Sequence, residues 1–154
     1  MSMKDVYHEL HITPAATQII CTDAAAFNTQ FNGATVDTLG YEGNMLVLYF
    51  GDLSNATVYT FQLFESDTSA AAAGSAVAGT QVDIRRHDGD TSERVAATGV
   101  LTMTGAGSEH NYYTFDYKGS MRWIHLVCGA GAGEDFWPGV MVIQAKGRRE
   151  PGHA

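Results

Sequence analysis

The chain consists mostly of short segments. In each segment, apolar side chains either alternate with polar ones or follow one another without interruption. Residues 7–12 alternate, whereas residues 45–50 are continuously apolar. Alternation with a period of two is typical of a strand with one buried face, and a short apolar run is typical of a strand covered on both faces. The pattern predicts about nine strands, over residues 7–12, 17–22, 34–38, 45–50, 58–65, 100–104, 112–117, 121–128 and 140–145.

Glycine separates most of these segments. The chain contains 17 glycines, and Asp88-Gly89 is a dipeptide that favours a tight hairpin turn. Residues 67–80 include an Ala-rich stretch that is too short and too often interrupted to form a stable helix, so we expect a surface loop or a single helical turn there. Many short strands with regular turn signals predict an all-β fold, an antiparallel β-sandwich of the jelly-roll-like kind.

Two segments resemble each other. Thr38-Leu-Gly-Tyr-Glu-Gly-Asn-Met45 aligns with Thr114-Phe-Asp-Tyr-Lys-Gly-Ser-Met121, and each precedes a long apolar strand. The similarity predicts that the same arrangement occurs at both segments: the end of a strand, a bend at a glycine, and then a central strand. It could place the two strands at corresponding positions in two packed sheets. Convergence on a common turn sequence explains the similarity equally well.

Length and charge narrow the range of functions. A chain of 154 residues fits one domain over residues 1–145, followed by a basic tail over residues 146–154. The net charge of −8 repels phosphate backbones, so we expect no nucleic-acid partner. No apolar run is long enough to span a membrane. The start of the sequence lacks a signal-peptide pattern, and we expect an intracellular origin, with Cys21 and Cys128 as buried, reduced thiols.

Candidate chemical sites are incomplete. His8 and His11 would point to opposite faces of one strand and cannot easily share a metal ion. Residues 87–90, with Asp83 nearby, lack the closing glutamate of a calcium loop and are better explained by a hairpin turn. His125 is in an unsuitable register to activate Cys128. We therefore expect no enzymatic activity, no metal and no cofactor.

The aromatic residues divide into core and interface candidates. The pattern assigns Tyr49, Phe50, Tyr59, Phe61 and Phe64 mostly to the core. Consecutive aromatics on a strand face both sides of a sheet, so one member of each such pair is a candidate for an interface, unless the strand is covered on both faces. Together with the first strand and the tail, they give the interface candidates Tyr7, Tyr112, Tyr113, Phe136, Trp137, Lys146, Arg148 and Arg149.

Several segments together resemble small virion proteins of tailed bacteriophages, and most nearly a capsid decoration, or cement, protein. The resemblance spans most of the chain except residues 69–78 and 87–94. It rests on Met3-Lys-Asp-Val-Tyr-His8, Val36-Asp-x-x-Gly-Tyr-Glu42, Phe61-x-Leu-x-Glu-Ser-Asp67, Tyr117-x-Gly-x-x-Arg-Trp123 and the basic tail.

This resemblance implies a β-sandwich that clamps neighbouring subunits of an assembled capsid from outside and has no catalytic residues. The implied partner is the major capsid protein, with further copies of the chain forming a homo-oligomer on the particle. The implied location is the virion, assembled in the host cytoplasm. A head–tail connector or tail protein is the alternative among virion proteins, and a carbohydrate-binding β-sandwich is the alternative from another class.

Overall fold

A computed structural model of the protein describes residues 10–14, 35–49, 58–69, 74–104, 112–130 and 139–145, without the side chains of residues 10–14 and 128–130. All regular secondary structure in these ranges is β-strand. The strands are β1 (Leu10–Pro14), β2 (Val36–Asp37), β3 (Gly43–Tyr49), β4 (Val58–Ser66), β5 (Ser75–Ala76), β6 (Val82–Asp88), β7 (Thr91–Ala96), β8 (Val100–Thr104), β9 (Tyr112–Tyr117), β10 (Trp123–Ala130) and β11 (Gly139–Ala145).

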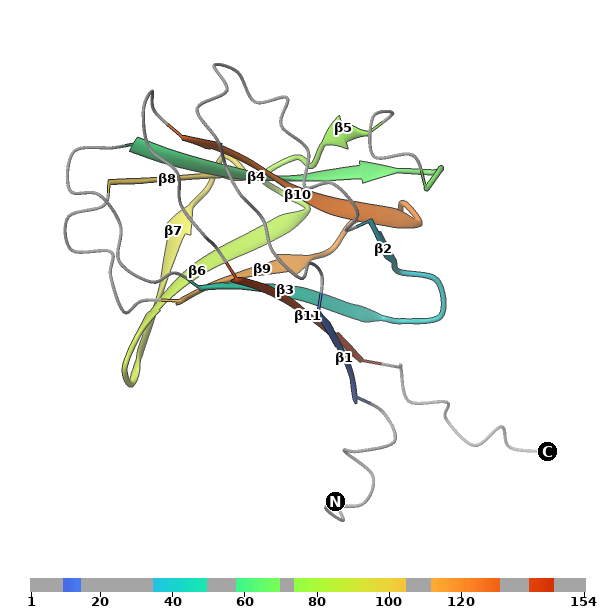
Figure 1. The fold of residues 1–154 in the computed structure, drawn as a ribbon, viewed down its shortest axis with the longest axis horizontal. Helices are drawn as coiled ribbons and strands as arrows, with labels where there is room; N and C mark the ends of the chain where they lie inside the picture. Colours follow the sequence, from blue (N-terminus) through green and yellow to red (C-terminus); the bar gives the residue numbers. More distant parts are fainter. Residues whose placement is uncertain are drawn as a thin grey trace, which may run out of the picture.

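The strands form two antiparallel sheets that face each other. A six-stranded sheet has the order β1-β11-β3-β9-β6-β7, and a five-stranded sheet has the order β2-β10-β4-β5, with β8 also paired to β4. Figure 1 shows the sheet that contains β4 and β10 lying over the sheet that contains β3, β9 and β11. The prediction of an all-β, antiparallel sandwich is confirmed.

The pairing between strands is nested along the chain. β1 pairs with β11, β2 with β10, β3 with β9, and β4 with β5. Strands β6 and β7 form an additional hairpin on the outer side of β9, and β8 adds to the edge of β4. Most stabilising contacts therefore join residues that are far apart in the sequence.

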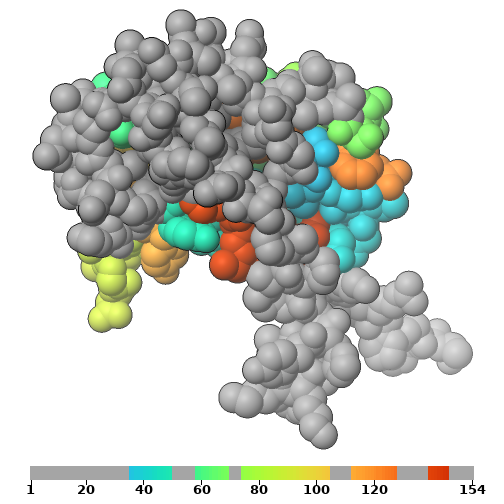
Figure 2. Space-filling model, viewed as in Figure 1, coloured from blue at the N-terminus to red at the C-terminus, as the bar shows by residue number. Residues whose placement is uncertain are grey.

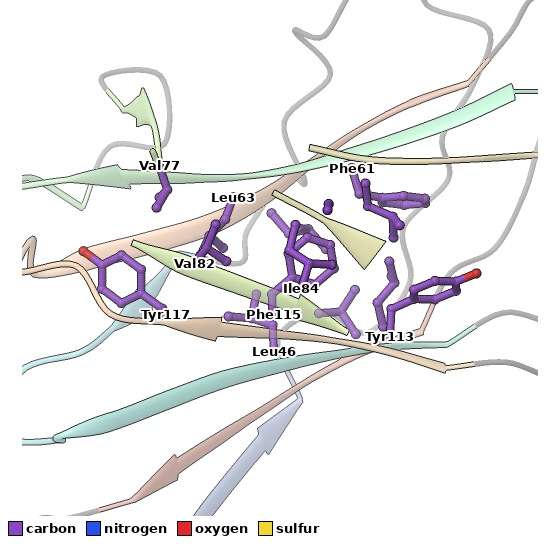
Figure 3. Close-up of a cluster of buried hydrophobic side chains, with 14 of the residues drawn as sticks. Leu46, Phe61, Leu63, Val77, Val82, Ile84, Tyr113, Phe115 and Tyr117 are labelled. Carbon is purple, nitrogen blue, oxygen red and sulfur yellow. The ribbon is translucent and has the colours of Figure 1, made fainter. Parts of the chain in front are cut away.

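The core lies between the two sheets and is built from alternate positions of the central strands. Leu46 and Leu48 of β3 face Phe61 and Leu63 of β4, and Phe115 of β9 lies among them, as Figure 3 shows for the labelled members. Burying each side chain of this kind contributes about 1.5–3 kcal/mol relative to its exposure. The alternation also fixes which side chains of each strand point away from the core.

The strand boundaries agree with the sequence pattern over most of the described chain. The expected strands over residues 100–104 and 112–117 are confirmed without change, and those expected over residues 45–50, 58–65, 121–128 and 140–145 are shifted by one or two positions. Of the first expected strand, residues 10–12 belong to β1, which extends to Pro14, and residues 7–9 lie outside the described residues. The strand expected over residues 17–22 and the tail over residues 146–154 lie outside the described residues.

Three strands were not predicted. The turn at Asp88-Gly89 does form a hairpin, with Gly89 at a φ of 55°, but the strands β6 and β7 on either side of it were missed. The expected loop or helical turn over residues 67–80 is wrong for Ser75–Ala76, which form β5. The backbone NH of Val77 then donates to Leu63 O at 2.9 Å, and the Val77 side chain is buried in the core.

The two similar segments lead into central strands of different sheets, as their resemblance suggested. β3 lies between β11 and β9 in one sheet, and β10 lies between β2 and β4 in the other. The connections before these strands, residues 38–42 and 118–122, both cross from one sheet to the other. Thr38 NH donates to Arg122 O at 2.8 Å, so the two crossovers lie against each other.

Candidate functional site

A row of aromatic side chains crosses the outer face of the six-stranded sheet. Tyr49 of β3 pairs with Tyr112 of β9, which pairs in turn with His87 of β6. The rings of His87 and Tyr112 are parallel within 1°, with centroids 4.5 Å apart, and His87 Nε2 is 2.9 Å from Thr114 Oγ1. Tyr49 is 49% exposed and Tyr112 is 41% exposed. Aromatic side chains held in this way offer apolar area to a partner without prior rearrangement.

A glycine on the neighbouring strand determines where Tyr49 lies. Gly139 of β11 pairs with Tyr49, and a Cβ atom at position 139 would collide with the tyrosine ring. The ring therefore lies across the glycine, in space that any other residue would fill. The combination of a strand glycine and a cross-strand aromatic covers the exposed backbone and orients the ring.

Two arginines beside the aromatic row share one carboxylate. Arg85 Nε donates to Asp83 Oδ2 at 3.0 Å, and Arg94 Nε lies 2.9 Å from Asp83 Oδ1 as an ion pair without hydrogen-bond geometry. Burial tends to raise the pKa of Asp83, but the hydrogen bond from Arg85 and the charges of the surrounding cations outweigh it and lower this pKa. Asp83 is therefore ionised and holds both guanidinium groups on this face.

A groove of about 330 Å³ lies where the two crossovers meet, lined by residues 38–42, 44 and 117–122. Arg122 makes a two-pronged contact with Asp37, with Nη2–Oδ2 at 2.8 Å and Nε–Oδ1 at 3.1 Å. The hydrogen bonds from Arg122 lower the pKa of Asp37. Thr38 Oγ1 donates to Arg122 O at 2.9 Å, which fixes the crossovers further. Arg122 and Thr38 thus bind groups in or next to the two crossovers, and we interpret the groove as the junction that holds the crossovers together.

A buried hydrogen bond connects the two sheets next to the groove between the crossovers. Tyr117 OH of β9 donates to Glu65 Oε2 of β4 at 2.5 Å and accepts from Met121 NH at 2.9 Å. Burial, together with the hydrogen bond to Glu65, raises the pKa of Tyr117 far above its ordinary value. A Cβ atom at Gly119 would collide with the Tyr117 ring, so the glycine bend and the tyrosine of this segment require each other.

His125 is a buried titratable residue, with an exposed fraction of 1%. Among the described residues, neither of its ring nitrogens has a hydrogen-bond partner. Its described neighbours are the Phe64 ring, with centroids 5.6 Å apart, and Gly74, where a Cβ would lie 2.7 Å from the imidazole. Burial lowers the pKa of His125, so the neutral form is favoured in the folded protein.

The structure separates the interface candidates that lie in described residues. Tyr112 is on the outer face, whereas Tyr113 is 3% exposed and belongs to the core, so Tyr113 is wrong as an interface residue. The expectation that one member of this pair faces outward is confirmed. Tyr7, Phe136, Trp137, Lys146, Arg148 and Arg149 lie outside the described residues, and their roles stay predictions.

Sequence reasoning missed the other members of the aromatic row. Tyr49 was assigned mostly to the core, but alternation along β3 buries Leu48 and places Tyr49 outside. The sequence pattern assigns His87 only to a turn region and gives no role to Arg85. The alternation of Val82 and Ile84 with polar residues was the available signal, because it puts Asp83, Arg85 and His87 on one face.

Within the described ranges, no group of three or more His, Cys, Asp or Glu side chains is placed to hold a metal ion. The same residues contain no helix with the length and apolar character needed to cross a membrane. No protein family, curated protein or solved structure matches the chain.

Proposed function

We propose that the protein is a non-enzymatic structural protein of a bacteriophage virion, and within that class a capsid decoration protein that binds the assembled shell and stabilises it. The observation that carries the proposal is the pair of exposed tyrosines, Tyr49 and Tyr112, on the outer face of a sheet whose inner face is packed. A rigid sheet that displays aromatic side chains is suited to binding a large, preformed surface. The resemblance of residues 3–8, 36–42, 61–67 and 117–123 to tailed-phage virion proteins supports the same class.

The strand pairing agrees with this proposal. When β6, β7 and β8 are left aside, the strand orders of the two sheets are β1-β11-β3-β9 and β2-β10-β4-β5. This is the order expected when a long antiparallel hairpin folds over into a jelly roll. Jelly rolls occur in viral capsid domains and in lectins, so the support is an analogy at the level of the fold.

A decoration protein stabilises a shell because it binds the assembled state and not the separated subunits. Occupancy at a hundredfold excess over the dissociation constant contributes about 2.7 kcal/mol per site. Many copies on one particle add these contributions, and contacts between copies raise the effective concentration.

A carbohydrate-binding function is the second candidate, and the position of Tyr49 favours it. The ring lies over Gly139 and is half-exposed, which is the arrangement that stacking against a sugar ring requires. A titration of the isolated protein with glycans separates the candidates, since a decoration protein binds assembled shells and not free sugars. A head–tail connector is distinguished by its location at the neck of the particle.

The proposal is tested by comparing particles that carry the protein with particles that lack it. Particles without the protein should release their DNA at a lower temperature, or under a weaker osmotic shock, than decorated ones. Equal stability of the two preparations would contradict the decoration function.

A further inference from the structure

The most distinctive surface of the described chain lies where the β6–β7 hairpin joins the six-stranded sheet. We name it the Tyr–Arg face and define it by Tyr49, Tyr112, His87, Arg85 and Arg94. Figure 2 shows the hairpin projecting at the lower border, beside parts of β9, β3 and β11 in that order. We infer that this face docks on an acidic patch of the capsid protein, an inference that rests on the proposed function.

The composition of the face is that of an interface centre. Tyr49 and Tyr112 are two of the four exposed large hydrophobic side chains in the described residues, and they are directly opposite each other on adjacent strands. Arg85 and Arg94 are themselves a cross-strand pair, with side chains 48% and 53% exposed. Tyrosine and arginine are enriched among the residues that supply most of the binding energy at interfaces.

The side chains of the face are also held in place before binding. The His87 ring stacks on Tyr112 and is hydrogen-bonded to Thr114. The Tyr49 ring lies against Gly139, in the space that a Cβ atom would otherwise occupy. Asp83 holds both arginines through their Nε atoms. Side chains that are already ordered lose less conformational entropy when a partner binds, and this raises affinity.

Charge indicates the chemistry of the partner. The face has two guanidinium groups against the single carboxylate of Asp83, whereas the whole chain has a net charge of −8. Asp116, the next carboxylate on this side of the sheet, is balanced by Lys118 at 3.9 Å. In the described part of the chain, the terminal nitrogens of Arg85 and Arg94 have no partner. Guanidinium groups in this state bind carboxylates in a two-pronged geometry, so the matching surface presents Asp or Glu side chains.

The experiment measures binding of the full-length protein to undecorated, assembled heads by co-sedimentation, for the wild type and three variants. Tyr112→Ala and the double variant R85E/R94E should each bind about tenfold more weakly or worse. Val58→Ser is the matched control, because Val58 is an exposed hydrophobic residue on the other sheet, and its binding should equal that of the wild type. Circular dichroism and thermal melting establish that all variants are folded.

The possible results distinguish a failure of this inference from a failure of the proposed function on which it rests. If the wild type binds heads and both Tyr112→Ala and R85E/R94E bind equally well, the Tyr–Arg face is not the docking surface. If Tyr112→Ala weakens binding but the charge reversal strengthens it, the partner surface is basic, which also overturns the inference. If the wild type does not bind heads at all, the decoration function fails and this inference fails with it.

Discussion

Tyr117 joins the two sheets through a single buried hydroxyl group, which donates to Glu65 and accepts from Met121 NH. Tyr117→Phe removes the hydroxyl and leaves both partners without it. We expect the free energy of unfolding to fall by about 1–3 kcal/mol, the cost of leaving buried polar groups unsatisfied. Urea denaturation measures the change. Tyr112→Phe is the control, since the exposed Tyr112 should tolerate the same deletion within about 0.5 kcal/mol. Equal losses in the two variants would contradict this role of Tyr117.

His125 predicts a dependence of stability on pH. Its pKa is lowered by burial in the folded protein, whereas the unfolded chain keeps the ordinary value of about 6.5. Between these two pKa values the unfolded state binds more protons, so stability is complete above about pH 6.5 and falls as the pH drops toward the folded-state pKa.

The variant His125→Leu isolates this contribution. Its free energy of unfolding should fall less steeply than that of the wild type between about pH 7.5 and about pH 5, because leucine has no proton to bind. Denaturation midpoints across this range measure the difference. Parallel curves for the two proteins would show that His125 does not titrate in this way.

For single residues, the sequence predicts burial only where the ends of the strand are known. Consecutive tyrosines at positions 112 and 113 had to face opposite sides, and they do. Tyr49 lies within the uninterrupted apolar run of residues 45–50, so its sequence pattern does not distinguish it from the buried residues before it. Its exposure depends on its position at the end of β3, which a local pattern does not contain.

The strands of the β6–β7 hairpin are not predicted from the sequence, because most of their side chains are exposed. Only Val82 and Ile84 of β6 are buried hydrophobic residues, and β7 is exposed over most of its length. The turn was recognisable because Asp-Gly has its own backbone preference. The strands were not, because the pairing of β6 with β9 and of β7 with β6 supplies the stability that their side-chain patterns lack.

The turn of this hairpin gives a prediction of its own. Gly89 has a φ of 55°, and a side chain there would meet nothing within 4 Å, so backbone strain alone opposes substitution. Gly89→Ala should lower the free energy of unfolding by about 1–2 kcal/mol. Gly89→Asn should cost less, because asparagine tolerates this conformation. Thermal or urea unfolding compares the three proteins, and equal costs for alanine and asparagine would contradict the explanation.

β5 is a second element that local reasoning could not identify. The surrounding Ala-rich stretch has helical propensity, but Val77 bonds Leu63 O and inserts its side chain into the core. Tertiary packing overrides a weak local preference. The position of this short strand therefore depends on its pairing with β4, the strand that precedes it in the chain.

For the whole molecule, the sequence predicted the layers but not their connections. A period-two pattern indicates that a strand has a buried face, and many such strands indicate a sandwich. The pattern does not say that β1 pairs with β11 or β3 with β9, because pairing partners leave no mark in a single strand. The Tyr–Arg face is a product of this register, since Tyr49, Tyr112 and His87 come from three separate strands.

We propose that the protein binds the outside of an assembled capsid, and imaging of mixed particles tests this most directly. Purified protein is mixed with undecorated phage heads, and the particles are imaged by electron cryomicroscopy. We expect added density on the outer surface of the shell, at repeated positions, with the six-stranded sheet toward the capsid protein. Density confined to the neck or tail, or heads that stay bare at saturating protein, would contradict it.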